Sequence, residues 1–156
     1  MRIDDEKPVL VGHDAVNLHH SEEYMVRYPM KYGFFNANKK ENYSTHQAVE
    51  DLATIISISI EKHMKLPPSA FKNFQCILVI PDSTVKVHMR YLMKGIFDLG
   101  FKAMLVHQES VMATFALSVS TAVVVDIGSS KTSVCCVEEG VVIQRSMIRK
   151  HFGGDD

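Results

Sequence analysis

The sequence predicts an α/β fold, and two observations carry this prediction. Short apolar runs that suit strands alternate with longer amphipathic segments between Ser44 and Asp126. Strands separated by helices pair in parallel through right-handed crossovers. The alternation then stops at Asp126, where a tight turn and two further apolar runs follow without a helix. We therefore expect an α/β part followed by a hairpin.

The composition is typical of an ordinary globular domain. The chain has 156 residues, 46% of them hydrophobic and 22% charged, enough for one core or two small lobes. Its formal net charge of -1 gives no basic surface for nucleic acid or for an anionic membrane. The acidic N-terminus, broken by Pro8, is unlike a secretory signal. The three cysteines have no zinc-type spacing, so we expect reduced, core-type thiols in an intracellular protein.

The first half of the chain contains one well-marked helix. Residues 1–43 are the least regular part, with a possible short strand over 9–12 and an extended piece and turn over 28–33. Ser44 and Gln47 form the pattern of a capping box. Apolar residues then recur at helical spacing as far as Met64, and the following Leu66-Pro67-Pro68 ends the helix.

The second half supplies the strands. CILVI (76–80) is apolar on both faces, which suits a central strand covered on both sides. We expect Pro81-Asp82-Ser83 to cap the next helix, which runs to Leu99 with Gly100 as its C-terminal cap. The remaining expected elements are a strand over 103–106, a helix over 109–117, a third strand over 122–126 and a hairpin that joins 135–137 to 141–143.

The third strand ends on a carboxylate at a turn with almost no side chains. Asp126 lies at the carboxyl end of its strand, where open α/β sheets bind ligands. Gly128, Ser129 and Ser130 follow, and small residues let backbone N–H groups approach an anion. An aspartate beside such a turn suits Mg²⁺, directly or through water. The alternative is a plain β-turn in which Asp126 accepts hydrogen bonds from the turn and Gly128 has a positive φ.

The wider pattern resembles the second phosphate hairpin of the actin, Hsp70 and sugar-kinase superfamily. VGHDA (11–15), RYPMKYG (27–33), VHQESVMATFA (106–116) and HFGGDD (151–156) are similar to actin stretches in the same order. HQES and KTSVCCVEEGV look most like the actin-related protein 8 family of chromatin remodelling complexes. The resemblance implies an actin-like (ribonuclease H-like) ATPase-domain fold, incomplete, with part of a first lobe over 1–120 and the start of a second over 121–156.

The resemblance also assigns roles to individual residues. Asp126 faces a Mg²⁺ ion through water, and Glu109 activates the attacking water. Phosphate contacts are implied for Gly128, Ser129 and Ser130. Cofactor binding is also implied for Asp126, Lys131 and Thr132, and for Gly153 and Gly154 in the turn that opens the following helix. For Glu109 the competing interpretation is a helix-N-terminal acid favoured by the macrodipole.

Two departures from the family pattern weaken the case for hydrolysis. Ser133 stands where conventional actins have a histidine near the attacking water. The first phosphate hairpin normally lies upstream of VGHDA, yet MRIDDEKP has no glycine turn. We therefore expect the chain to be a fragment that contains one of the two phosphate hairpins. ATP or ADP binding should then be weak, and ATPase activity weak at most.

Two functions are implied by the resemblance. The first is an assembly module of an INO-eighty-type remodelling complex in the nucleus, with roles in transcription regulation, DNA repair and DNA recombination. Its partners are actin, other nuclear actin-related proteins, the remodeller motor subunit and histones, with DNA contacted only within the complex and no membrane. The second is an ATPase that uses Asp126, Mg²⁺ and Glu109. An unrelated α/β domain with an ordinary turn is a third interpretation.

Overall fold

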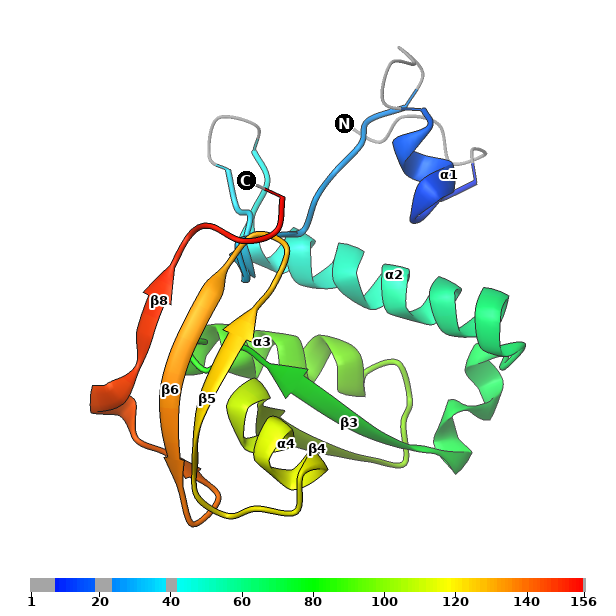
Figure 1. Cartoon of the computed structure of the whole chain (residues 1–156). Coiled ribbons are helices and arrows are strands. Elements are labelled where there is room, and N and C mark those ends of the chain that lie inside the picture. The colour runs from blue at the N-terminus through cyan, green and yellow to red at the C-terminus, as the bar shows by residue number, and fades with distance from the viewer. Residues whose placement is uncertain (1–7, 19–23, 39–41, 156) are drawn as a thin grey trace.

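The described residues form two main sheets, with helices packed around the first and one helix between them, and a separate two-stranded hairpin near the N-terminus. The computed structural model describes residues 8–18, 24–38 and 42–155. The helix α2 (Thr45–Met64) lies across the molecule in Figure 1, with α3 (Lys86–Phe97) alongside it. The first sheet lies beneath these helices, and the second sheet forms the opposite side of the view. A short helix, α1 (His13–Val16), is tied to α2 by an ion pair between Asp14 and Lys62.

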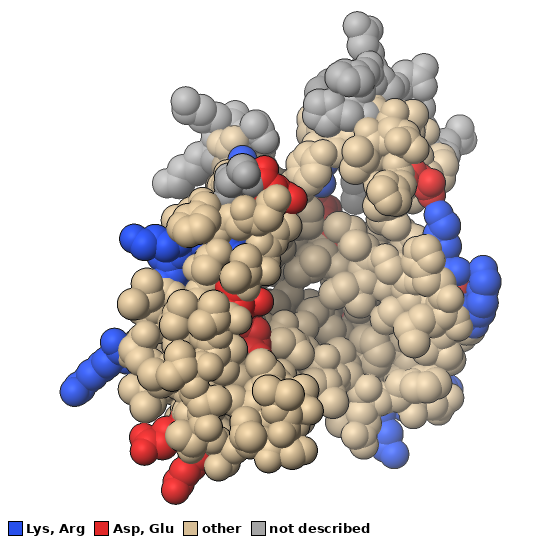
Figure 2. All heavy atoms as spheres, viewed as in Figure 1, with Lys and Arg blue, Asp and Glu red and all other residues tan. Residues whose placement is uncertain are grey.

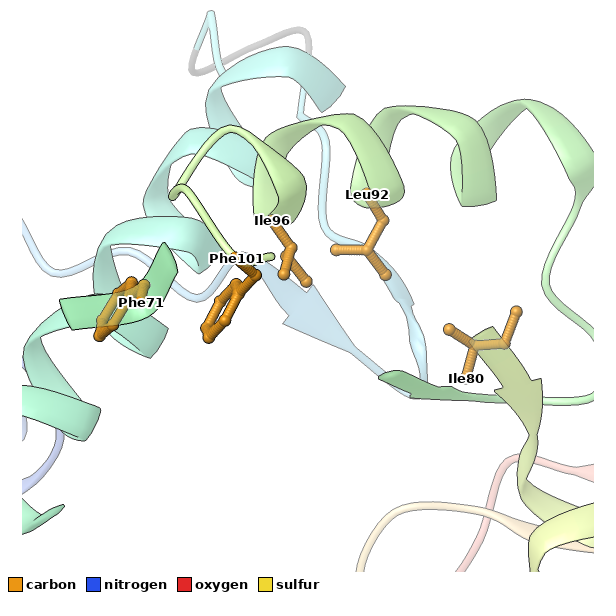
Figure 3. Close-up of a cluster of buried hydrophobic side chains, with 5 residues drawn as sticks. All are labelled: Phe71, Ile80, Leu92, Ile96 and Phe101. Carbon is orange, nitrogen blue, oxygen red and sulfur yellow. The ribbon is translucent and has the colours of Figure 1, made fainter. Parts of the chain in front are cut away.

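The first sheet is a parallel pair, as the alternation of strands and helices predicts. Strand β3 (Gln75–Ile80) pairs in parallel with β4 (Ala103–Gln108), from Gln75 opposite Ala103 to Ile80 opposite Gln108. One face of this pair packs on α2 and α3 around a buried cluster (Figure 3) of Phe71, Ile80, Leu92, Ile96 and Phe101. The rings of Phe71 and Phe101 stack with centroids 4.8 Å apart. This cluster is the main core of the chain.

The predicted boundaries of α2 are confirmed. Ser44 accepts a hydrogen bond from the Gln47 backbone N–H, and the Gln47 side chain accepts one from the Ser44 N–H, which completes the capping box. The helix ends at Met64 with Lys65 in the left-handed conformation, before the two prolines. Gly95 lets α3 approach α2 closely, since a Cβ there would lie 2.4 Å from Cγ1 of Val49.

The second sheet is antiparallel. Strand β5 (Ala122–Ile127) pairs with β6 (Thr132–Glu138), which also pairs with β7 (Val141–Val142) and β8 (Ile148–Lys150). Its buried cluster consists of Val111, Cys135, Val137 and Val142. Val111 belongs to α4 (Glu109–Ala116), and α4 contacts strands of both sheets. The predicted hairpin at Glu138-Glu139-Gly140 is confirmed, with positive φ at Glu139 and Gly140 as a type I′ turn requires.

A second hairpin lies near the N-terminus. Strands β1 (Met30–Lys31) and β2 (Phe34–Phe35) pair antiparallel around Tyr32 and Gly33, both of which have positive φ. This confirms the extended piece and turn expected over 28–33.

Three local predictions are wrong. Residues 9–12 form no strand. The helix after CILVI begins at Lys86 without a side-chain cap, because the buried Asp82 carboxylate is bonded to Ser110 instead. The third strand, β5, does not extend the parallel pair but opens the second sheet.

The strands of both sheets are exposed on one face within the described residues. Ile77 and Val79 of β3 and Leu105 of β4 are about half exposed or more, and so are Val123 and Val125 of β5. The expected coverage of CILVI on both faces is therefore not found in the part of the chain that the structure describes. Figure 2 shows that this side of the molecule is hollowed between the second sheet and the α2 side, with acidic side chains on the wall formed by the second sheet.

Candidate functional site

The β5–β6 hairpin turns at residues 128–131, where most side chains are small. We call this turn the corner. Gly128 closes it by donating its backbone N–H to the carbonyl of Lys131 at 2.8 Å. The N–H groups of Ser129 and Ser130 donate no hydrogen bond to any described residue. Gly128 does not have a positive φ, and the contact of Asp126 with the turn is an ion pair with the Lys131 ammonium. The positive φ that the plain β-turn interpretation assigns to Gly128 is therefore not found.

The turn at 152–155 packs directly on this corner. The N–H of Gly154 donates to the carbonyl of Gly128 at 3.0 Å, and that of Asp155 to the carbonyl of Ser129 at 2.8 Å. A Cβ on Gly153 would lie 2.2 Å from the Gly128 carbonyl oxygen, so only glycine allows this approach. Thr132 adds a hydrogen bond from its hydroxyl to the carbonyl of Phe152. The structure thus brings Gly153 and Gly154 together with the hairpin. Their contact with a nucleotide, which the family resemblance implies, stays a prediction.

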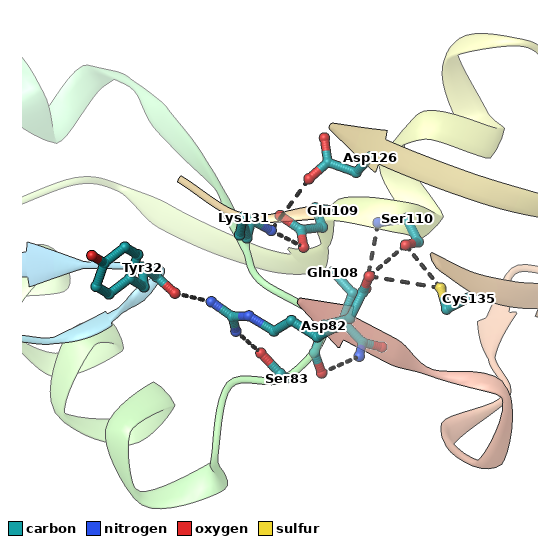
Figure 4. Close-up of polar contacts among 10 residues, drawn as sticks. Tyr32, Asp82, Ser83, Gln108, Glu109, Ser110, Asp126, Lys131 and Cys135 are labelled. Atoms are coloured by element: carbon teal, nitrogen blue, oxygen red, sulfur yellow. Dashed lines mark hydrogen bonds and ion pairs between the residues drawn. The ribbon is translucent and has the colours of Figure 1, made fainter. Parts of the chain in front are cut away.

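Lys131 connects the two candidate carboxylates (Figure 4). Its ammonium donates to Glu109 and lies 3.3 Å from Oδ2 of Asp126. The Lys131 side chain is only 14% exposed, that of Glu109 22% and that of Asp126 41%. Glu109 is the first residue of α4, so both interpretations of its position remain compatible with the fold. The contact of Lys131 with both carboxylates was not foreseen, because nothing in the local sequence relates Glu109 to Lys131.

A buried polar cluster lies behind this site. Asp82 is 5% exposed and accepts hydrogen bonds from the hydroxyl and the backbone N–H of Ser110. Cys135 donates to the Ser110 hydroxyl at 2.9 Å. Burial raises the pKa of the Cys135 thiol, so the thiol stays protonated, in line with the prediction of a core-type cysteine. The cluster fixes the loop after β3 and the start of α4 against β6.

Arg149 joins the second sheet to the N-terminal hairpin. Its guanidinium donates to the Ser83 hydroxyl and to the Tyr32 carbonyl, and it lies 4.2 Å from the ring centroid of Phe34. Desolvation lowers the pKa of Arg149. Gly33, which Arg149 approaches, has a φ of +72°, a conformation that favours glycine at that turn. Sequence inspection gave no signal for this contact, because Tyr32 and Arg149 are far apart in the chain.

Comparison with known proteins identifies the family. The family model described as Actin matches residues 2–156. This chain belongs to the actin family. The actin-like fold is also supported by a solved structure, "Human actin-related protein Arp8 in its ATP-bound state", which shares 35% identity and a TM-score of 0.87 over 94% of this chain and 29% of that chain.

Curated relatives point to the same branch of the actin family. The chain is 38% identical to actin-related protein 8 of Salmo salar and 36% identical to that of Homo sapiens, each over 148 residues and 94% of the chain. It spans about a quarter of the length of these relatives, 23% and 24% respectively. The predictions that the chain is an actin-related protein and that it has an actin-like fold are therefore confirmed. The division into lobes at residue 120 stays a prediction.

The described residues include neither a set of clustered metal ligands nor a membrane-spanning helix. Among the described residues, no group of three or more His, Cys, Asp or Glu side chains is arranged to hold a metal ion. No helix in the described ranges is long and apolar enough to cross a bilayer. The expected absence of a glycine hairpin before Val9 falls mostly on residues 1–7, which lie outside the described part of the chain.

A groove of about 730 Å³ lies elsewhere, at the carboxyl ends of β3 and β4. It is lined by Asp82, Ser83 and Gln108 among others, but not by Glu109, Asp126 or Lys131. This groove is therefore separate from the hairpin and ion pairs that define the candidate site.

Proposed function

We propose that this chain supplies one phosphate-binding half of an ATP or ADP site, in an actin-related protein that acts mainly as an assembly subunit. The observation that carries the proposal is the corner at Gly128–Lys131, where the N–H groups of Ser129 and Ser130 have no acceptor among the described residues. Such groups bind phosphate oxygens, and the neighbouring Lys131 ammonium adds a positive charge. The similar human Arp8 structure is in an ATP-bound state.

The nucleotide proposal is tested by disturbing the corner without touching a charged group. In the full-length product of the gene that encodes this chain, we expect Gly153→Ala to weaken ATP binding about tenfold or more, because its Cβ would displace the Gly128 carbonyl. Gly100→Ala is the matched control, since its Cβ meets no atom within 4 Å and its cost is only that of a positive φ. Equal ATP affinity for both variants in titration calorimetry would refute the proposal.

The assembly role is proposed at the level of the whole protein. Its setting is an INO-eighty-type remodelling complex in the nucleus, with actin, other nuclear actin-related proteins, the motor subunit and histones as partners, and with roles in transcription regulation, DNA repair and DNA recombination. Support comes from the similarity to actin-related protein 8 over 94% of the chain. Nucleotide then has a structural or regulatory role.

Affinity purification of the tagged full-length gene product tests the assembly role. We expect the motor subunit and actin to be recovered, and we expect lower recovery with Gly153→Ala if nucleotide supports assembly. An untagged strain is the control for background. Consistent absence of remodeller subunits from the purified material excludes this role.

An ATPase remains the second candidate, because Glu109 and Asp126 both lie at the hairpin and share Lys131. In that case Asp126 positions Mg²⁺ through water and Glu109 activates the attacking water. Asp126→Ala should then lower steady-state phosphate release by the full-length gene product by orders of magnitude, with Asp98→Ala as an exposed control. Equal rates for Asp126→Ala and the wild type exclude hydrolysis through these residues.

A further inference from the structure

The residues around Asp126 do not fit a bound divalent cation as they are arranged. A Mg²⁺ ion held by Asp126, directly or through water, needs free carboxylate oxygens and room for several waters. Oδ2 of Asp126 instead faces the Lys131 ammonium at 3.3 Å, and the same ammonium donates to Glu109. A divalent cation beside Asp126 would also be repelled by this fixed positive charge.

Lys131 is held in this position by its surroundings and is not a freely moving surface lysine. Its backbone carbonyl accepts the hydrogen bond that closes the hairpin. Its side chain is 14% exposed and lies between the end of β5 and the first turn of α4 (Figure 4). A lysine ammonium is a compact point charge that binds phosphate as well as carboxylate.

We propose that the Lys131 ammonium takes the place of the divalent cation, so that the protein binds nucleoside triphosphate without Mg²⁺. The ammonium then lies between the two carboxylates and the terminal phosphates, and it supplies the positive charge that a metal would otherwise supply. Glu109 serves as a counter-ion for Lys131, and this pairing keeps it from acting as a base. The inference rests on the proposed nucleotide site and names the cation of that same site.

Titration of ATP into the full-length gene product, with Mg²⁺ or with EDTA, tests the proposal. For the wild type we expect the two dissociation constants to agree within about threefold. Lys131→Met should weaken ATP binding in EDTA about tenfold or more, while Lys131→Arg, which keeps the charge, should weaken it less. Lys150→Met, which changes an exposed lysine of β8, is the matched control and should behave as the wild type does.

A second measurement does not depend on nucleotide. Mn²⁺ titrated into the nucleotide-free protein and followed by electron paramagnetic resonance should show no binding at Asp126 in the wild type. Lys131→Met should gain a Mn²⁺ site, and Asp126→Asn in the same variant should remove it.

The outcomes separate this proposal from the proposed function. Loss of ATP binding in EDTA, or Mn²⁺ binding by the wild type that Asp126→Asn abolishes, overturns the role of Lys131 while leaving a nucleotide site in place. Absence of ATP binding in both Mg²⁺ and EDTA overturns both proposals together.

Discussion

At the scale of single residues, the most consequential side chain outside the hairpin is Asp82. Its position after CILVI suggests a helix cap, yet the carboxylate is buried and bonded to Ser110, 28 residues further along the chain. A buried carboxylate must have donors. The hydroxyl and the backbone N–H of Ser110 provide them, and Cys135 in turn donates to the Ser110 hydroxyl. Local sequence cannot show such a cluster, because its three members come from three different elements.

Removal of the Asp82 carboxylate should destabilise the fold. Asp82→Ala leaves the buried Ser110 donors without their acceptor, and we expect a loss of about 1–3 kcal/mol in the free energy of unfolding. Asp98→Ala, at an exposed position at the end of α3, is the control. Denaturant unfolding of the full-length gene product measures both variants, and equal midpoints for Asp82→Ala and wild type would show that the cluster contributes nothing.

The buried thiol predicts a pH dependence of alkylation. Because burial raises the pKa of Cys135, its thiolate fraction near pH 7.5 lies below that of an ordinary cysteine, and only the thiolate reacts. Iodoacetamide should therefore label Cys135 slowly, with a rate that rises about tenfold per pH unit until the raised pKa is reached. Mass spectrometry of the labelled peptides, with Cys135→Ala as the control, measures this. Rapid labelling at neutral pH in the folded protein contradicts the buried position.

At the scale of elements, the sequence was most informative where a local interaction decides the structure. The capping box at Ser44 and the prolines after Leu66 predict both ends of α2, and Glu139-Gly140 predicts the last hairpin. The apolar run over 9–12 is a strand by composition but pairs with no strand among the described residues. The hairpin at Asp126 was found from its own residues, whereas its partner Glu109 was assigned only through the family resemblance.

The capping box offers a direct test of α2. Ser44→Ala removes the acceptor for the Gln47 N–H, and we expect a loss of about 1 kcal/mol in stability. Ser69→Ala, at an exposed position in the short 3-10 helix Pro68–Asn73, is the matched control and should have little effect. Identical unfolding midpoints for the two variants would mean that α2 does not depend on its cap.

At the scale of the whole molecule, the exposed faces of the two sheets are the main feature. Ile77 is 60% exposed and Ile127 is 73% exposed. The other edge of β3 is paired with no described strand. Unpaired edges and large apolar patches favour association with other chains. The apolar character of these strands was evident from the sequence, but which face is covered depends on distant elements and could not be predicted.

We therefore expect the isolated 156-residue chain to fold poorly. Its thermal unfolding should be broad, and the chain should bind a hydrophobic dye such as ANS and tend to aggregate. Calorimetry and dye fluorescence measure this, with the full-length gene product as the control. A sharp cooperative transition without dye binding would show that the two clusters of buried residues suffice.

The measurement that tests the central claim most directly is a crystal structure of the full-length gene product with bound ATP. We expect the terminal phosphates within hydrogen-bond distance of the Ser129 and Ser130 N–H groups, with the Lys131 ammonium beside them. Nucleotide bound away from this corner, or a corner whose N–H groups are turned to protein acceptors while ATP is bound elsewhere, would contradict it.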